Sequence, residues 1–202
     1  YKTSGSVLTI AIDIVLSQTF EDYEIICIND DEHDDYREAF SQIAESYVDR
    51  SNLLFLSHKC NLGANAARND AILASSGEWL AFLDADDYWD AEYLKTAYEK
   101  SVEGNYAIIS TPIRIIKAKS TRYMHFHHAN GNIYNEELHG DILSPSSGIC
   151  VRKEALLAVG GFDNSLPDRQ DYDMWLRMCE HFEVAFCSDI GVSVVRDGHE
   201  SI

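Results

Sequence analysis

An apolar run that ends abruptly in carboxylates constrains the fold of this chain more than any other stretch. Residues 79–83, Trp-Leu-Ala-Phe-Leu, have the pattern of a strand that is buried on both faces. The polarity then reverses, and aspartates follow closely: Asp84, Asp86, Asp87 and Asp90. Such a strand places oxygen ligands at the carboxyl edge of a sheet, where open α/β sheets bind their ligands. The stretch predicts a Mg²⁺ or Mn²⁺ site for a phosphorylated ligand. The alternative is an acidic turn in which Asp90 only caps the following helix.

Short strands and helices alternate along the first half of the chain. Strands are expected at residues 23–28, 53–56, 79–83 and 106–110, and helices at residues 7–16, 35–47, 61–76 and 91–102. The connections between them are only a few residues long. This alternation is typical of a mostly parallel, doubly wound α/β sheet.

The pattern changes after residue 110. Apolar stretches at residues 113–116 and 123–126 predict a hairpin. Further elements are expected as helices at residues 153–159 and 171–180 and as strands at residues 182–186 and 191–195. Three histidines gather beside the hairpin: His125, His127 and His128. Solvated side chains explain them better than a metal site does.

Composition excludes several classes of protein. With 202 residues and a hydrophobic content of 46%, the chain is long enough for one sizeable core. A formal charge of −18 argues against a nucleic-acid partner, because phosphate backbones bind basic surfaces. No apolar run approaches the ~20 residues that span a bilayer. The cysteines, five in number and without C-x-x-C spacing, fit a reducing cytosol.

Charged residues near the ends of the expected elements suggest one chemistry. Asp30, Asp84 and Asp86 follow expected strands, and Arg68 lies near the N-terminus of an expected helix. These side chains suit a nucleoside diphosphate whose phosphates are bridged by a metal and lie near Arg68. Asp171 opens a later helix and is a candidate general base. Helix caps at the aspartates and a surface ion pair at Arg68 are the structural alternatives.

Motifs in a fixed order resemble those of the family 2 glycosyltransferases, which are inverting nucleotide-sugar enzymes. Residues 12–26 resemble the family's first helix and second strand, and I-N-D-D-E-H-D (28–34) resembles V-D-D-G-S-T-D. N-L-G-A-N-A-A-R-N (61–69) resembles N-x-G-x-s-x-A-R-N, and F-L-D-A-D-D-Y-W (82–89) resembles F-L-D-x-D-D. G-G-F-D (160–163) and Q-D-Y-D-M-W-L-R (170–177) resemble G-x-F-D followed by E-D-x-D-L-W-L-R.

The resemblance implies a GT-A fold, a Rossmann-like three-layer αβα sandwich with a mostly parallel central sheet and a small C-terminal region on the acceptor side. Residues 1–110 would form the nucleotide-sugar-binding half, and residues 111–202 the acceptor-binding and catalytic-base half. The implied site residues are Asp30, Arg68 and Asp84 for the nucleotide, Asp86 and His199 for Mg²⁺ or Mn²⁺, and Asp171 as the base. Asp30 would contact the uracil of a UDP-sugar, and Asp84 would lie by the ribose.

Four departures from family patterns matter. The family's first strand, an apolar run ending in proline and Tyr-Asn, is expected before residue 1. Asp31 occupies the glycine position of D-D-G-S, where a turn that needs a positive φ would be strained. Gln170 stands where glutamate often precedes the base, so the base role depends on Asp171 alone. The Q-x-x-R-W motif of processive synthases is absent, which favours transfer of one sugar at a time.

The predicted function is transfer of a single sugar from a nucleotide-sugar to a saccharide or lipid-linked acceptor. The expected location is the cytoplasm, including the inner face of the membrane, and the number of subunits stays open. A sugar-phosphate nucleotidyltransferase is the enzymatic alternative, but its glycine-rich phosphate loop is missing. A non-catalytic metal- or nucleotide-binding module is the other alternative. An EF-hand loop from Asp84 fails because Trp89 and Lys95 occupy its glycine and glutamate positions.

Overall fold

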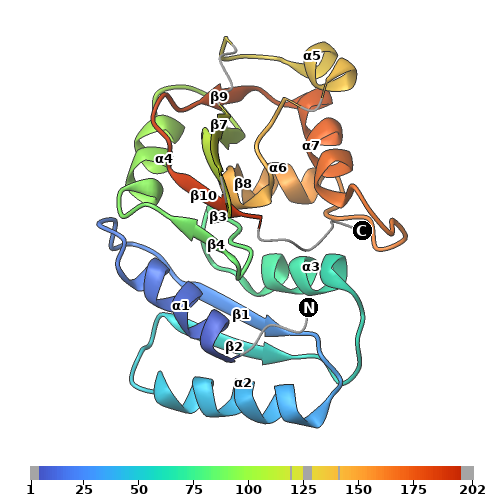
Figure 1. The fold of residues 1–202 in the computed structure, drawn as a ribbon. Coiled ribbons are helices and arrows are strands. Elements are labelled where there is room, and N and C mark those ends of the chain that lie inside the picture. The colour runs from blue at the N-terminus through green and yellow to red at the C-terminus, as the bar shows by residue number, and fades with distance from the viewer. Residues whose placement is uncertain (1–4, 119, 125–128, 141, 197–202) are drawn as a thin grey trace.

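The computed structural model describes residues 5–118, 120–124, 129–140 and 142–196 (Figure 1). Its helices are α1 (Gly5–Leu16), α2 (Asp34–Ser46), α3 (Ala64–Ala74), α4 (Tyr93–Ser101), α5 (Tyr134–His139), the 3₁₀ helix η1 (Ser146–Gly148), α6 (Lys153–Ala158) and α7 (Gln170–His181). Its strands are β1 (Ile25–Asn29), β2 (Leu53–Ser57), β3 (Trp79–Ala81), β4 (Asp87–Trp89), β5 (Ile108–Ser110), β6 (Ile113–Lys117), β7 (Ser120–Met124), β8 (Ile149–Arg152), β9 (Val184–Phe186) and β10 (Val192–Val195).

The described strands form small sheets of mixed direction. β1 and β2 make a parallel pair, and the other sheets have the orders β4-β10-β6-β7 and β3-β8-β5-β9. The expected α/β alternation and the hairpin of β6 and β7 are present. The expectation of one mostly parallel sheet is wrong for these strands, since four of their seven pairings are antiparallel. The cause is long-range pairing: β8 lies antiparallel between β3 and β5. The order of elements along the chain does not specify such neighbours.

Helices cover the sheets on several sides. Figure 1 shows α2 beneath β1 and β2, with α1 in front of them, and α6 and α7 beside the upper strands. The core lies where α7 packs on these strands, because the apolar residues of α7 repeat on one face of the helix. Met174, Trp175 and Met178 are at most 1% exposed and belong to one cluster with Ile108 and Val151. The middle of α7 therefore packs against the sheet that contains β5 and β8.

Among the helices of the described part of the chain, none has the length and apolar character needed to cross a bilayer. The 13-residue α2 is well short of the ~20 residues required.

The turn after β1 tolerates a non-glycine residue. Of the described non-glycine residues, Arg169 alone has a positive φ, so Asp31 avoids the strain that its glycine-like position suggested. The Asn29 side chain accepts a hydrogen bond from the Asp31 backbone N–H (3.1 Å), and the Asp31 carboxylate accepts one from the His33 N–H (2.9 Å). These successive side-chain turns replace the glycine conformation.

Candidate active site

The acidic turn that follows β3 is anchored from its other side by Ser147. Ser147 Oγ accepts a hydrogen bond from the Asp84 backbone N–H (3.1 Å), and its carbonyl oxygen accepts one from Trp89 Nε1 (2.7 Å). The Asp87 N–H donates to the Asp84 carbonyl oxygen (2.9 Å) and closes the turn. Asp84 and Asp86 are exposed as a result, whereas Asp87 is buried. The turn therefore presents two carboxylates, fewer than its sequence contains.

The strand before this turn is shorter and less buried than expected. β3 covers residues Trp79–Ala81 and is half-buried rather than buried on both faces. Asp90 does not cap α4, because its carboxylate pairs with Arg114 Nη2 (2.8 Å) and Glu92 takes the N-cap position. The alternative prediction, that Asp90 caps the helix after the acidic turn, is therefore wrong.

Clustered charge acts on the buried aspartate of this turn. Burial raises the pKa of the Asp87 carboxyl to about 6, a hydrogen bond from Ser147 opposes the rise, and the charges of Asp84 and Asp86 add to it. Arg196 lowers the same pKa. The turn thus has an excess of negative charge, which a cation would offset.

Arg68 forms an ion pair with the acidic turn. It lies on α3, and its Nη2 is 3.2 Å from Asp84 Oδ1. Its guanidinium carbon lies 5.5 Å from the centre of the Phe162 ring, within the range of a cation–π contact. Arg68 is therefore held between β3 and the loop before α7, although Asp84 is half exposed and remains reachable by a ligand.

Asp30 holds the loop that precedes α3. Its carboxylate accepts hydrogen bonds from the Leu62 and Gly63 backbone N–H groups (both 2.8 Å), and His58 Nδ1 lies 2.7 Å away. Burial raises the pKa of the Asp30 carboxyl, but these hydrogen bonds outweigh burial and keep the pKa below its ordinary value. A carboxylate has about four acceptor sites, so the three contacts leave one of them unused. No motif in the sequence marked His58 as part of this arrangement.

Two asparagines of α3 bind the loop that leads to the candidate base. Asn69 Oδ1 accepts a hydrogen bond from the Phe162 N–H (2.9 Å), and Asn69 Nδ2 donates to the Phe162 carbonyl oxygen (2.8 Å). Asn65 Nδ2 donates to the Asp163 carbonyl oxygen (2.7 Å). The motifs at residues 61–69 and 160–163 are therefore one contact surface, which their separation in sequence concealed.

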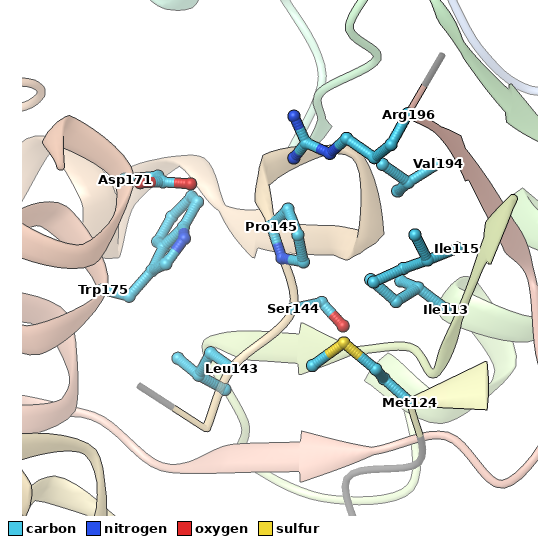
Figure 2. A pocket seen from close by; sticks show the side chains of 10 residues that line it. All are labelled: Ile113, Ile115, Met124, Leu143, Ser144, Pro145, Asp171, Trp175, Val194 and Arg196. Atoms are coloured by element: carbon cyan, nitrogen blue, oxygen red, sulfur yellow. The ribbon is translucent and has the colours of Figure 1, made fainter. Parts of the chain in front are cut away.

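The candidate base Asp171 lines a cavity of about 140 Å³. Figure 2 shows Asp171 and Trp175 of α7 on one side of this cavity, Arg196 and Val194 on the other, and Pro145 between them. Asp171 and Trp175 lie one helical turn apart and so share a face of α7. The cavity is mostly apolar, with further lining by Ile113, Ile115, Met124, Leu143 and Ser144.

A buried donor lies in the wall of this cavity. Trp175 is 1% exposed, and its Nε1 has no hydrogen-bond partner among the described residues. Figure 2 shows the indole nitrogen on the side of the ring that faces Pro145. An unpaired buried N–H costs roughly 1–3 kcal/mol. A ligand oxygen in the cavity would satisfy this donor.

The predicted metal site is only partly within the described residues. His199, and also His125, His127 and His128, lie outside them. In the described segments, no group of three or more His, Cys, Asp or Glu residues is placed to hold a metal. The donor chemistry nevertheless fits Mg²⁺ or Mn²⁺, because Asp84 and Asp86 offer exposed hard oxygens. Such sites usually bind the metal through one or two carboxylates together with the phosphates of the substrate.

Comparison with known proteins gives the family. The family model described as "Glycosyl transferase family 2" matches residues 1–165. The chain belongs to glycosyl transferase family 2. The resemblance found in the motifs is thereby confirmed.

Two relatives with known sequences are similar to this chain. An uncharacterised glycosyltransferase of Nostoc sp. is 31% identical over 77% of this chain and 50% of its own length. The UDP-Glc:alpha-D-GlcNAc-diphosphoundecaprenol beta-1,3-glucosyltransferase of Escherichia coli is 29% identical over 56% of this chain and 43% of its own length. The chain thus spans half or less of these family members.

The fold matches a solved structure of a larger protein. S. aureus TarS 1–349 in complex with UDP-GlcNAc superposes with a TM-score of 0.77 at 18% identity, covering 98% of this chain and 57% of that chain. At this identity the likeness establishes the mixed α/β architecture and not the ligand. The family membership also favours a glycosyltransferase over the nucleotidyltransferase alternative.

Proposed function

We propose that this family 2 domain is an inverting glycosyltransferase that moves one sugar from a UDP-sugar to a saccharide or lipid-linked acceptor. One observation carries the proposal: Pro145 lines the cavity of Asp171, and Ser147, two residues further along the chain, accepts a hydrogen bond from the Asp84 N–H in the acidic turn. The candidate donor side and the candidate base are therefore adjacent. A lipid-linked acceptor would bring the enzyme to the inner face of the membrane.

The donor would bind along residues 1–110. Asp30 has one acceptor site left for the uracil N–H, Asp84 lies near the ribose, and Arg68 near the diphosphate. The names of two similar proteins support uridine nucleotides, since the TarS structure holds UDP-GlcNAc and the E. coli relative uses UDP-Glc. A divalent cation on Asp86, with His199 as a second ligand, would supply charge compensation for the departing diphosphate.

Asp171 would act on the acceptor in residues 111–202. Its carboxylate would take the proton of an acceptor hydroxyl as that oxygen forms a bond to the anomeric carbon. The bond from this carbon to the diphosphate breaks at the same time, and its electron pair leaves with the phosphate oxygen. The attack is in line, so the anomeric configuration inverts, and no sugar becomes covalently bound to the enzyme. The apolar cavity wall would hold the ring of the transferred sugar, and Trp175 Nε1 would donate a hydrogen bond to one of the oxygens of this ring.

The proposal is tested on the full-length protein with UDP-glucose and UDP-GlcNAc. Calorimetry with and without Mn²⁺ measures binding, and UDP release in the presence of saccharide and polyprenyl-linked acceptors measures transfer. Asp86→Asn is expected to remove the Mn²⁺-dependent part of binding. Asp171→Asn is expected to keep binding and to lower transfer about 10²–10⁴-fold. Asp189→Asn, on the exposed turn between β9 and β10, is the matched control.

Three outcomes would contradict the proposal. Absence of nucleotide binding in the wild-type protein would remove the donor site. Full transfer by Asp171→Asn would show that another group is the base, and Mn²⁺-dependent binding by Asp86→Asn would move the metal site elsewhere.

A further inference from the structure

His58 lies between two carboxylates at the edge of the candidate nucleotide site. Its Nδ1 is 2.7 Å from Asp30 Oδ1, and its Nε2 is 2.8 Å from Asp70 Oδ2. The side chains of His58 and Asp30 are only 10% and 14% exposed, whereas that of Asp70 is 52% exposed. The imidazole therefore joins the end of β1 to α3, which also carries Arg68.

Both contacts are hydrogen bonds only when both ring nitrogens carry protons. An ionised carboxylate only accepts, and a neutral imidazole donates through one nitrogen while the other presents a lone pair. The hydrogen bond to Asp30 raises the pKa of His58, burial opposes this, and Asp70 adds to the rise. The imidazolium is therefore the form that this arrangement stabilises.

The charged groups around His58 come from three elements. Asp30 approaches from the end of β1 and Asp70 from α3. From α2, Arg37 Nη1 donates to the carbonyl oxygens of His58 (3.0 Å) and Lys59 (3.3 Å), so this arginine fixes the backbone of the loop. Loss of the proton leaves a lone pair facing a carboxylate oxygen. The contact to the more exposed Asp70 is expected to open, because two backbone N–H groups also hold Asp30.

We propose that His58 is a positioning residue for the nucleotide. As an imidazolium it holds Asp30 and the loop of residues 58–63 against α3, and nucleotide affinity falls when it loses its proton. The inference rests on the nucleotide binding proposed above. Asp30 would meet the base and Arg68 the phosphates, so the link through Asp70 fixes the distance between the two ends of the ligand.

The sign of the effect follows from this arrangement. At low pH His58 is charged and both contacts are intact, so UDP binds with full affinity. As pH rises through the pKa of His58 in the folded protein, affinity falls by at least about five-fold, the lower end of coupling between linked equilibria. By reciprocity, bound UDP raises the pKa of His58.

The test measures UDP affinity by calorimetry from about pH 5.5 to about pH 8.5, a range that brackets the ordinary pKa of histidine. The proteins are wild type, His58→Gln, Asp70→Asn and the control His181→Gln, which changes an exposed histidine at the end of α7. The phosphate of UDP also titrates, but equally in all four. His58→Gln is expected to keep the pH dependence that the UDP phosphate causes and to lose the remaining part, which wild type and His181→Gln share. Asp70→Asn is expected to shift the fall in UDP affinity to lower pH.

An NMR titration of the histidine ring protons gives a second measurement in the wild-type protein. The His58 resonance is expected to titrate above the ordinary histidine range and to move further up with UDP. Equal pH dependence in wild type and His58→Gln, or a His58 pKa that UDP leaves unchanged, would overturn the inference. Absence of UDP binding at every pH would instead overturn the proposed function, so the two failures are distinguishable.

Discussion

Asn69 on α3 and Phe162 in the loop before α7 exchange two hydrogen bonds, as neighbouring strands of a sheet do. The Phe162 N–H donates to Asn69 Oδ1 (2.9 Å), and Asn69 Nδ2 donates to the Phe162 carbonyl oxygen (2.8 Å). Gly161 is fitted to this contact, since a Cβ at its position would lie 2.7 Å from Asn69 Oδ1. One amide side chain thereby fixes the loop of the candidate base against the helix of the candidate donor site.

Removing this amide is predicted to destabilise the fold. Asn69→Ala leaves the Phe162 N–H and carbonyl groups without partners, at a cost of about 1–3 kcal/mol in the free energy of unfolding. Urea denaturation measures the change. Asn105→Ala, on an exposed turn after α4, is the control and is expected to stay within about 0.5 kcal/mol of wild type. Equal stability of the two variants would show that the Asn69 contact contributes nothing.

Arg68 is predicted to act on UDP affinity. Arg68→Gln removes the charge beside Asp84 and is expected to weaken UDP binding about ten-fold, which corresponds to about 1.4 kcal/mol for a charged hydrogen bond. Calorimetry with UDP measures this change in affinity. Arg122→Gln, on the exposed β7, matches the chemical change away from the site and is expected to bind UDP as wild type does. A loss of affinity in both variants would indicate only a change in net charge.

Trp175 is predicted to donate to a sugar oxygen through its indole nitrogen. Trp175→Phe keeps an aromatic ring against Phe82 and Phe162 but removes the N–H group. The KM for the UDP-sugar is expected to rise about ten-fold. The free energy of unfolding is expected to change by less than about 1.5 kcal/mol, because the buried indole N–H has no hydrogen-bond partner to lose. Enzyme kinetics measure the KM, and urea denaturation measures the free energy of unfolding. A large loss of stability with an unchanged KM would make Trp175 a core residue only.

Glu24 gives a prediction of pH dependence away from the site. Its Oε1 accepts hydrogen bonds from the Ser76 N–H (2.6 Å), Ser76 Oγ (2.8 Å) and the Gly77 N–H (3.1 Å), at the turn before β3. Burial raises the pKa of this carboxyl, but the hydrogen bonds outweigh it and lower the pKa overall. A lowered pKa stabilises the folded protein above the ordinary glutamate pKa, and the contribution disappears as pH falls through the lowered value.

Glu24→Gln is therefore expected to be less stable than wild type at neutral pH, and the difference is expected to shrink in acid, where the carboxylate of Glu24 takes up a proton. Urea denaturation at about pH 7 and about pH 3.5, on either side of the ordinary glutamate pKa, measures the difference. Glu21→Gln, an exposed neighbour, is expected to match wild type at both values. A stability difference that persists unchanged in acid would show that the Glu24 charge is not the cause.

The sequence alone located most of the elements and the residues that carry charge at their ends, but it predicted neither β4 nor α5. Local periodicity and strand-end polarity located β1, β2, β3 and α3, and motif order gave the family. These signals are local, because an apolar run or a helix cap is specified by residues a few positions apart. They could not show that the strands pair in mixed directions, since pairing depends on contacts between distant segments.

Only the tertiary structure decided how the candidate site is held. Ser147 reaches the turn at Asp84 from a position 63 residues later, and Asn69 reaches Phe162 across 93 residues. His58, an isolated histidine in a loop, gained a role only through its distances to Asp30 and Asp70. Hydrogen-bond partners are set by packing and not by composition, so no local pattern could have shown which of these residues contact one another.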